Sequence, residues 1–175
     1  MTRLVRTIGI AMAFIAGARL ELGAQSAQPM SLELSGAGNF AMDANPALDP
    51  QSRPAVEGQA RYTFSRFSLG IGAVIQSPQN NLRQLRGSAF VEPRYVVGSW
   101  PGKAFYLATR FGYGRFICTT RCTDEDSHVT YGAGAGILIR VSPRVNADLG
   151  AEYFRVANWS ASGYSLLRAG LTLGL

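Results

Sequence analysis

The stretch VTYGAGAGILIRV, residues 129–141, alternates between two kinds of side chain. Its odd-numbered positions are all apolar, from Val129 to Val141, whereas its even-numbered positions include three glycines, Thr130 and Arg140. Successive side chains of a β-strand point to opposite faces of the sheet, so this period of two predicts a strand with one apolar face.

Seven further segments repeat this period, at residues 31–41, 56–65, 67–76, 88–97, 105–114, 145–153 and 166–175. Each has roughly the ten residues that a tilted strand needs to cross a bilayer. No segment has a convincing helical period. In the fourth segment Pro93 removes one ladder hydrogen bond, so we expect a bulge or a locally weak pairing there.

The connections between these segments alternate in length. Long connections at residues 42–55, 77–87, 117–127 and 157–163 are separated by short ones at 65–66, 98–103 and 142–144. This rhythm is typical of an up-and-down barrel whose two ends face different compartments. The predicted fold is therefore all-β, an eight-stranded antiparallel up-and-down transmembrane barrel.

The polar face of the predicted strands carries equal numbers of acidic and basic residues. They are Glu33, Glu57, Glu92, Asp148 and Glu152, with Arg61, Arg94, Arg110, Arg140 and Arg168. Balanced charge suits a closed lumen, where an unpaired charge is costly. Aromatic residues of the apolar face gather near both ends of the strands, as in the interfacial girdles of membrane barrels. A soluble, lipocalin-like barrel that hides its apolar face around a ligand is the opposite arrangement.

The last predicted strand ends in Arg168-Ala-Gly170-Leu-Thr-Leu173-Gly-Leu175. It is similar to the carboxy-terminal signal that the barrel-assembly machinery reads, although Leu175 stands where Phe is usual. Over residues 30–175 the chain resembles the small eight-stranded outer-membrane proteins of the OmpA/OmpX type. The resemblance implies an integral outer-membrane protein with periplasmic termini and extracellular long loops. Its implied partners are outer-membrane lipids, lipopolysaccharide and, during biogenesis, the assembly machinery.

The first residues predict a secretory signal peptide. Arg3 and Arg6 precede about twelve apolar residues, too few for the ~20 that a membrane-spanning helix needs. Small residues at 23–27 suit cleavage near Ser26. We therefore expect residues 1–26 to be removed and residues 27–175 to form the barrel domain.

Composition argues against a nucleic-acid partner. The net charge is +6, but the basic residues are scattered singly and form no run or basic helix. We expect no cofactor.

Cys118 and Cys122 lie close together in the third long connection, where an oxidising export route favours a disulfide between them. A zinc site with His128 and the acids at 124–126 is an alternative, although the spacing matches no recognised motif. His128 is the only histidine. Lipid A deacylases carry a His-x-Ser-Asn motif, whereas this chain has His128-Val-Thr130-Tyr131, so we expect His128 to be a solvated loop residue and assign no catalytic residue.

Three functions remain open. The first is a non-enzymatic barrel that displays four surface loops, with a role in envelope integrity, adhesion or binding of an unknown extracellular or envelope partner. Arginines in and beside these loops could contact lipopolysaccharide phosphates; they are Arg53, Arg83, Arg86, Arg115, Arg121 and Arg155. The alternatives are an enzyme that modifies lipid A or phospholipid, and a narrow porin. Eight strands enclose barely enough space for side chains, and ten lumen charges should plug such a pore.

Overall fold

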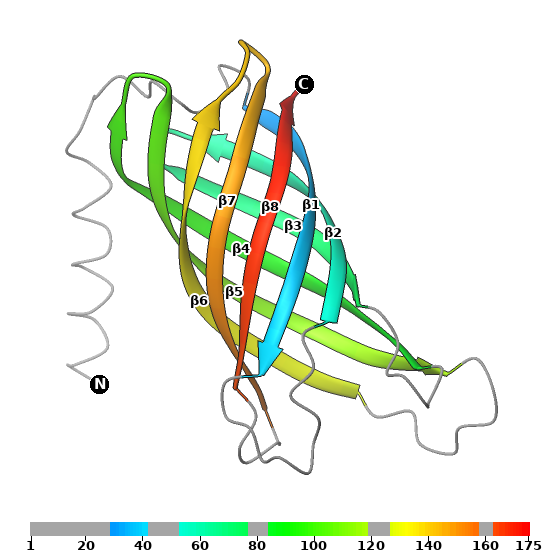
Figure 1. Ribbon diagram of the computed structural model, residues 1–175. Helices are drawn as coiled ribbons and strands as arrows, with labels where there is room; N and C mark the ends of the chain where they lie inside the picture. Colours follow the sequence, from blue (N-terminus) through cyan, green and yellow to red (C-terminus); the bar gives the residue numbers. More distant parts are fainter. Residues whose placement is uncertain (1–28, 42–52, 77–83, 119–126, 158–162) are drawn as a thin grey trace, which may run out of the picture.

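The computed structural model describes residues 29–41, 53–76, 84–118, 127–157 and 163–175. These residues form eight strands in one closed barrel, in which each strand pairs antiparallel with the next and the last pairs with the first (Figure 1). The strands are β1 (Met30–Ala41), β2 (Arg53–Phe64), β3 (Phe67–Gln76), β4 (Gln84–Trp100), β5 (Lys103–Cys118), β6 (Ser127–Arg140), β7 (Val145–Val156) and β8 (Gly163–Gly174). Within the described residues no helix is long and apolar enough to cross a membrane. The predicted fold is confirmed.

The two faces of the strands differ as the period of two predicts. In β1 the polar residues Ser31 and Glu33 are buried inside the barrel, whereas Leu32 and Leu34 are exposed on its outer wall. The same holds around the whole barrel, where exposed Leu, Ile and Val side chains cover the outside. The charged residues in the middle of the strands are buried, whereas Lys103, Arg140 and Arg155, near strand ends, are exposed. The barrel is therefore apolar outside and polar inside.

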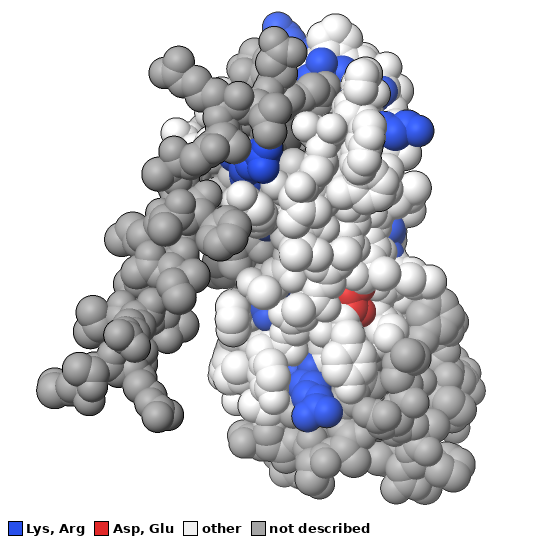
Figure 2. Space-filling model, turned by 90° about the vertical axis from the view of Figure 1, so that its left-hand side faces the viewer, with Lys and Arg blue, Asp and Glu red and all other residues white. Residues whose placement is uncertain are grey.

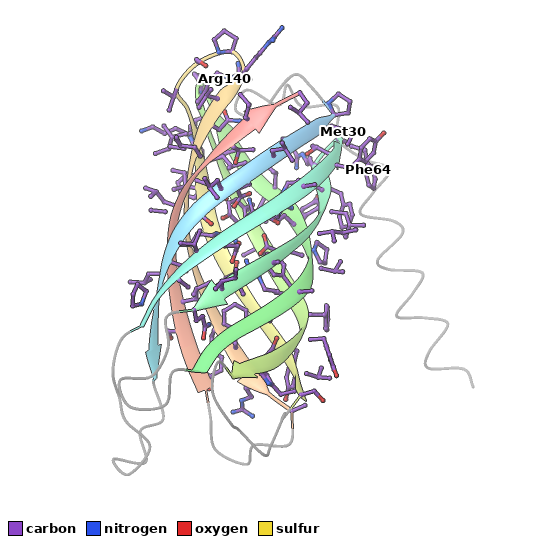
Figure 3. The ribbon with its side chains drawn as sticks, turned by 90° about the vertical axis from the view of Figure 1, so that its right-hand side faces the viewer. Met30, Phe64 and Arg140 are labelled. Atoms are coloured by element: carbon purple, nitrogen blue, oxygen red, sulfur yellow. The ribbon has the colours of Figure 1, made fainter. Side chains whose placement is uncertain are left out.

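Three short turns lie at one end of the barrel, together with Met30 and the end of β8 (Figures 1 and 3). Ser65 in the β2–β3 turn has a φ of 53°, and Gly102 in the β4–β5 turn has a φ of 74°. The β4–β5 connection is shorter than the sequence predicts, because β4 runs on to Trp100 and β5 starts at Lys103. Glycine supplies the left-handed conformation that this two-residue turn requires.

Pro93 weakens the pairing between β4 and β5 without shifting it. Cα partners between these strands stop at Val91 and resume at Arg94 in the same register. On its other side Pro93 still pairs with Leu69 of β3. The register shift of β4 lies further along, between Val96 and Gly98. The expectation of locally weak pairing at Pro93 is thus confirmed, and the bulge lies elsewhere.

Exposed aromatic side chains form two belts on the outer wall. One belt lies near the short turns and includes Tyr62, Phe64, Trp100 and Phe105. The other lies near the opposite end of the barrel and includes Phe111, Tyr113, Tyr131 and Tyr153. Both belts agree with the predicted aromatic girdles, and Trp100 joins one of them because it lies in β4 rather than in the predicted turn at residues 98–103.

Candidate functional site

The interior of the barrel holds a network of nine charged side chains, each at most 5% exposed. We call it the lumen network; its members are Glu33, Glu57, Arg61, Glu92, Arg94, Arg110, Asp148, Glu152 and Arg168. They come from β1, β2, β4, β5, β7 and β8. Strands β3 and β6 contribute glycines to the inner face at the same depth, and these make room for the long side chains of the strands beside them. The predicted charge-paired lumen is confirmed.

Glu92 of β4 is the centre of this network. Its carboxylate accepts from Arg61 Nη2 at 2.8 Å, from Arg94 Nε at 2.5 Å and from Arg168 Nη1 at 3.0 Å. It also accepts from Arg110, whose Nε lies 2.9 Å from Oε2. One fully buried carboxylate therefore joins all four guanidinium groups of the network.

Arg110 of β5 forms the side of the network nearer the long connections. Its Nη1 and Nη2 donate to the two carboxylate oxygens of Glu57, at 2.6 and 2.9 Å, and its Nε lies 3.1 Å from Glu152 Oε2. The guanidinium also lies over the ring of Phe90, 3.9 Å from the centroid. Phe90 packs with Ala55 and Val74 in an apolar cluster, which fills the lumen next to the charges.

Asp148 and Tyr106 form the other side of the network. Arg94 Nη1 donates to Asp148 Oδ2 at 2.7 Å, and Tyr106 donates its hydroxyl to Asp148 Oδ1 at 2.6 Å. The same hydroxyl accepts from Arg168 Nη2 at 2.9 Å. Arg94 Nη2 reaches Glu33 Oε1 at 3.0 Å. A second apolar cluster, of Val96, Ala104, Tyr106 and Ala108, packs beside these groups.

Arg140 does not belong to the lumen network, contrary to the sequence prediction. It is the last residue of β6, and its side chain is exposed at the short-turn end of the barrel (Figure 3). Alternation places Arg140 on the inner face, but the strand ends there, beyond the buried layer. The network therefore contains five carboxyl groups and four guanidinium groups, rather than equal numbers of the two.

A small cavity lies in the lumen beside the network. A cavity of ≈ 20 Å³ lies beside Arg61, Arg94 and Tyr106 and is also lined by Ser31, Thr63, Ser68, Val96, Leu138, Asn146 and Thr172. That volume holds about one or two water molecules. At the level of the lumen network, charged and aromatic side chains thus occupy the interior of the barrel.

His128 lies on the inner face of β6 and is only 5% exposed, so the expectation of a solvated loop residue is wrong. The strand starts at Ser127, two residues before Val129, where the predicted strand begins. A Cβ atom at Gly114 of the neighbouring strand would lie 2.6 Å from His128 Nε2, so the imidazole occupies the space that this glycine leaves.

The two cysteines lie at or beyond the edge of the described residues. Cys118 is the last residue of β5, but its side chain and all of Cys122 lie outside the described residues. The disulfide and the alternative zinc site therefore stay predictions. Among the residues whose side chains are described, no group of three or more His, Cys, Asp or Glu residues could hold a metal ion.

The predicted assembly signal forms most of β8, which closes the barrel against β1. Arg168 points inward and belongs to the lumen network, whereas Leu173 and Leu175 are exposed on the outside. Gly170 lies against Ser35 of β1, where a Cβ atom would collide with the serine side chain. Each of these residues thus has a structural role. That the barrel-assembly machinery recognises them stays a prediction.

No protein-family model matches this sequence, and no curated protein is similar enough to match it. Solved structures do match. Neisserial surface protein A superposes with a TM-score of 0.69 at 15% identity, over 84% of this chain and 97% of that one. The N-terminal β-barrel domain of Pseudomonas aeruginosa OprF gives 0.58 at 11% identity, over 83% and 98%.

Ail, the attachment invasion locus protein of Yersinia pestis, gives a TM-score of 0.54 at 14% identity, over 82% of this chain and 96% of that one. At such identities the comparison establishes the fold and nothing more specific. With its closed antiparallel barrel and charge-paired lumen, the chain has the fold of the small eight-stranded outer-membrane β-barrels.

Proposed function

We propose that this protein is an integral outer-membrane barrel with a non-enzymatic role at the cell surface. The short turns and both termini of the barrel domain face the periplasm, and the four long connections face outward. The role is envelope integrity, adhesion or the binding of a surface partner.

The observation that carries this proposal is the inverted polarity of the barrel. Leu34, Ile71 and Leu171 are 65%, 64% and 57% exposed on three different strands, while Glu92 and Asp148 are fully buried. Monomeric soluble proteins rarely expose a contiguous apolar surface of this kind. A bilayer covers such a surface, and the two aromatic belts match its two interfaces.

The filled lumen supports a role at the surface rather than transport. Four guanidinium groups and five carboxyl groups join across the barrel, and the cavity beside them is only ≈ 20 Å³. A narrow porin predicts stable conductance steps in planar bilayers, and we expect none.

The position of His128 supports a non-catalytic role. The imidazole is buried inside the barrel, and the Thr130 hydroxyl lies against Gly112 on the same inner face. A histidine and a hydroxyl group that hydrolyse a lipid must be able to contact it. The side chains of His128 and Thr130 instead point into the barrel, away from the outer wall. An enzyme acting on lipid A predicts a changed lipid A mass on controlled expression, and we expect an unchanged mass.

Two experiments test the proposal. The first is electrophoresis of the washed outer-membrane fraction, boiled and unboiled; a folded membrane barrel shifts on boiling, and a soluble protein without a shift would overturn the proposal. The second places an epitope either within residues 77–83 or at Pro143. Antibody should label intact cells only for the first insertion, and the reverse would invert the proposed orientation.

We also propose lipopolysaccharide phosphates as a ligand of the arginines in and beside the long connections, because guanidinium groups pair with phosphate oxygens in a bidentate manner. Purified protein should retain lipopolysaccharide, and variants with these arginines changed to Gln should retain less. Equal retention by the variants would leave an unidentified surface partner as the remaining candidate.

A further inference from the structure

Each of the three short connections contains a basic side chain or is directly followed by one, and Arg140 at the end of β6 is a further exposed cation at the same end of the barrel. Arg66 lies in the β2–β3 turn, Lys103 directly follows the β4–β5 turn, and Arg144 ends the β6–β7 connection. Lys103 and Arg144 are exposed, and Arg66 is half-buried. We call these three residues the rim cations. Figure 2 shows Lys and Arg side chains at this end of the molecule, at the top of the view.

The backbone holds the rim cations in place. The carbonyl of Arg66 accepts from Val96 N at 2.8 Å, and that of Arg144 accepts from Gly174 N at 2.7 Å. The β4–β5 turn is fixed in the same way, by a 2.8 Å bond from Arg140 N to Gly102 O. Each turn is thus hydrogen-bonded to a neighbouring strand, so the three charges stay at separate points of the rim.

Acidic side chains do not offset these charges in the part of the chain that the structure describes. Every Asp and Glu with a described side chain belongs to the lumen network and is buried. The described part of the rim is therefore positively charged, which favours an anionic ligand.

Aromatic residues flank two of the rim cations. The rings of Phe64 and Phe67, on either side of Arg66, lie 5.1 Å apart, and those of Trp100 and Phe105, on either side of Lys103, lie 5.0 Å apart. Aromatic belts mark the boundary between hydrocarbon and headgroups. Lys and Arg beside such a belt reach the headgroups with their charged ends.

We propose that the rim cations bind the phosphate groups of anionic phospholipids in the leaflet next to the short turns. This inference rests on the proposed membrane-spanning function. The distribution of the charges favours lipid over a folded acidic protein, because the three turns follow one another around the barrel. A single protein partner covers one sector of the rim, whereas lipid surrounds all of it.

Trp100 provides a local reporter, because it is 57% exposed and three residues from Lys103. The sequence has two tryptophans, so Trp159→Phe leaves Trp100 as the single fluorophore. The full barrel is folded into vesicles of phosphatidylcholine that contain a fixed fraction of either brominated phosphatidylglycerol or brominated phosphatidylcholine. Bromine quenches tryptophan only at short range, so quenching measures which lipid lies beside the rim.

We expect brominated phosphatidylglycerol to occupy the site next to Trp100 with a preference of up to about fivefold, which is what one cation near an anionic surface supplies. The variant R66Q/K103Q/R144Q should lose most of the preference, since it keeps the exposed Arg140. The vesicles contain no lipopolysaccharide, so Arg155→Gln, an exposed arginine of β7 near the other end of the barrel, should keep the preference in full. A boiling-dependent shift on electrophoresis confirms that each variant is folded. High salt should remove the preference from the unchanged rim as well, which gives a test without mutation.

Equal quenching by the two brominated lipids would overturn this inference and leave the membrane-spanning function intact. Absence of quenching by either lipid would mean that Trp100 does not face a bilayer, and it would overturn both. A preference that survives in R66Q/K103Q/R144Q would also overturn the assignment to the rim cations.

Discussion

Arg110 and Glu57 join two strands that are not neighbours in the sheet. The guanidinium on β5 donates to both carboxylate oxygens on β2, at 2.6 and 2.9 Å, with β3 and β4 between them along the wall. A bidentate pair of this kind has a fixed geometry. The pair therefore crosses the lumen and fixes the spacing of two parts of the barrel wall.

Removing one partner of this pair should be costly. Arg110→Ala leaves Glu57 and Glu152 with fewer partners inside the barrel, and breaking a buried ion pair costs about 3–5 kcal/mol. Urea unfolding in lipid vesicles measures the free energy of unfolding. As a control, Arg144→Ala at the exposed rim should change it by no more than about 0.5 kcal/mol. An equal, small effect of both substitutions would mean that Arg110 faces water.

The surplus carboxyl group of the network leads to a second prediction. Glu57 receives two bonds from Arg110 and one from Arg168, whereas Glu33 accepts one bond, at 3.0 Å from Arg94. Glu33 Oε2 is buried and has no hydrogen-bond partner among the described residues. Glu33→Gln should therefore change the free energy of unfolding by less than about 1 kcal/mol, and Glu57→Gln should lower it by several times as much.

The same unfolding measurement on the two Gln variants checks this ranking, and the substitutions are matched because both keep the size of the side chain. A larger loss for Glu33→Gln than for Glu57→Gln would mean that the excess negative charge does not lie at Glu33.

Tyr106 gives a third prediction, because its hydroxyl bonds two charged groups. It donates to Asp148 at 2.6 Å and accepts from Arg168 at 2.9 Å. Hydrogen bonds to charged groups contribute about 1.5–3 kcal/mol each, so Tyr106→Phe should lower the free energy of unfolding by at least that amount. Tyr62→Phe on the outer wall removes the same atom from a residue that is 54% exposed, and it should have little effect. Indistinguishable unfolding curves for the two variants would contradict the assigned role of the hydroxyl.

Much of the fold follows from the sequence because a period of two fixes the face of each residue. Leu34 and Glu33 lie on opposite faces for this reason alone, and the charged lumen follows from it. The period does not fix depth along the barrel. Arg140 follows the predicted alternation but lies at the short-turn end of the barrel, and the predicted loop position of His128 is wrong because β6 begins before it.

The centre of the network could not be predicted from the sequence. Four arginines meet at Glu92 because of the register between neighbouring strands, and this register is set by pairing and closure rather than by any local pattern. The glycines of β3 and β6 were a usable signal. Glycines interleaved on the polar face predict room in a narrow lumen for long arginine side chains, and the structure has this arrangement.

These glycines give the last prediction. A Cβ atom at Gly134 of β6 would overlap Glu152 Cγ and the carbonyl oxygen of Ala151, so Gly134→Ala must displace a member of the lumen network. Forcing extra atoms into a packed interior costs about 1–3 kcal/mol. Gly58 on β2 is the matched control, since a Cβ atom there has nothing within 4 Å. Gly58→Ala should raise the free energy of unfolding by about 0.4–1 kcal/mol, because alanine restricts the unfolded chain.

The opposite signs of these two effects make the comparison decisive. Both variants replace one glycine by alanine in a strand, so β-propensity and the unfolded state change equally. Gly58 lies between the buried residues Glu57 and Gln59 and therefore faces outward. The difference between the two unfolding free energies thus compares the inner face of β6 with the unobstructed outer wall. Stabilisation by Gly134→Ala similar to that by Gly58→Ala would mean that the inner face of β6 is open, and that the lumen is wide enough for the porin alternative.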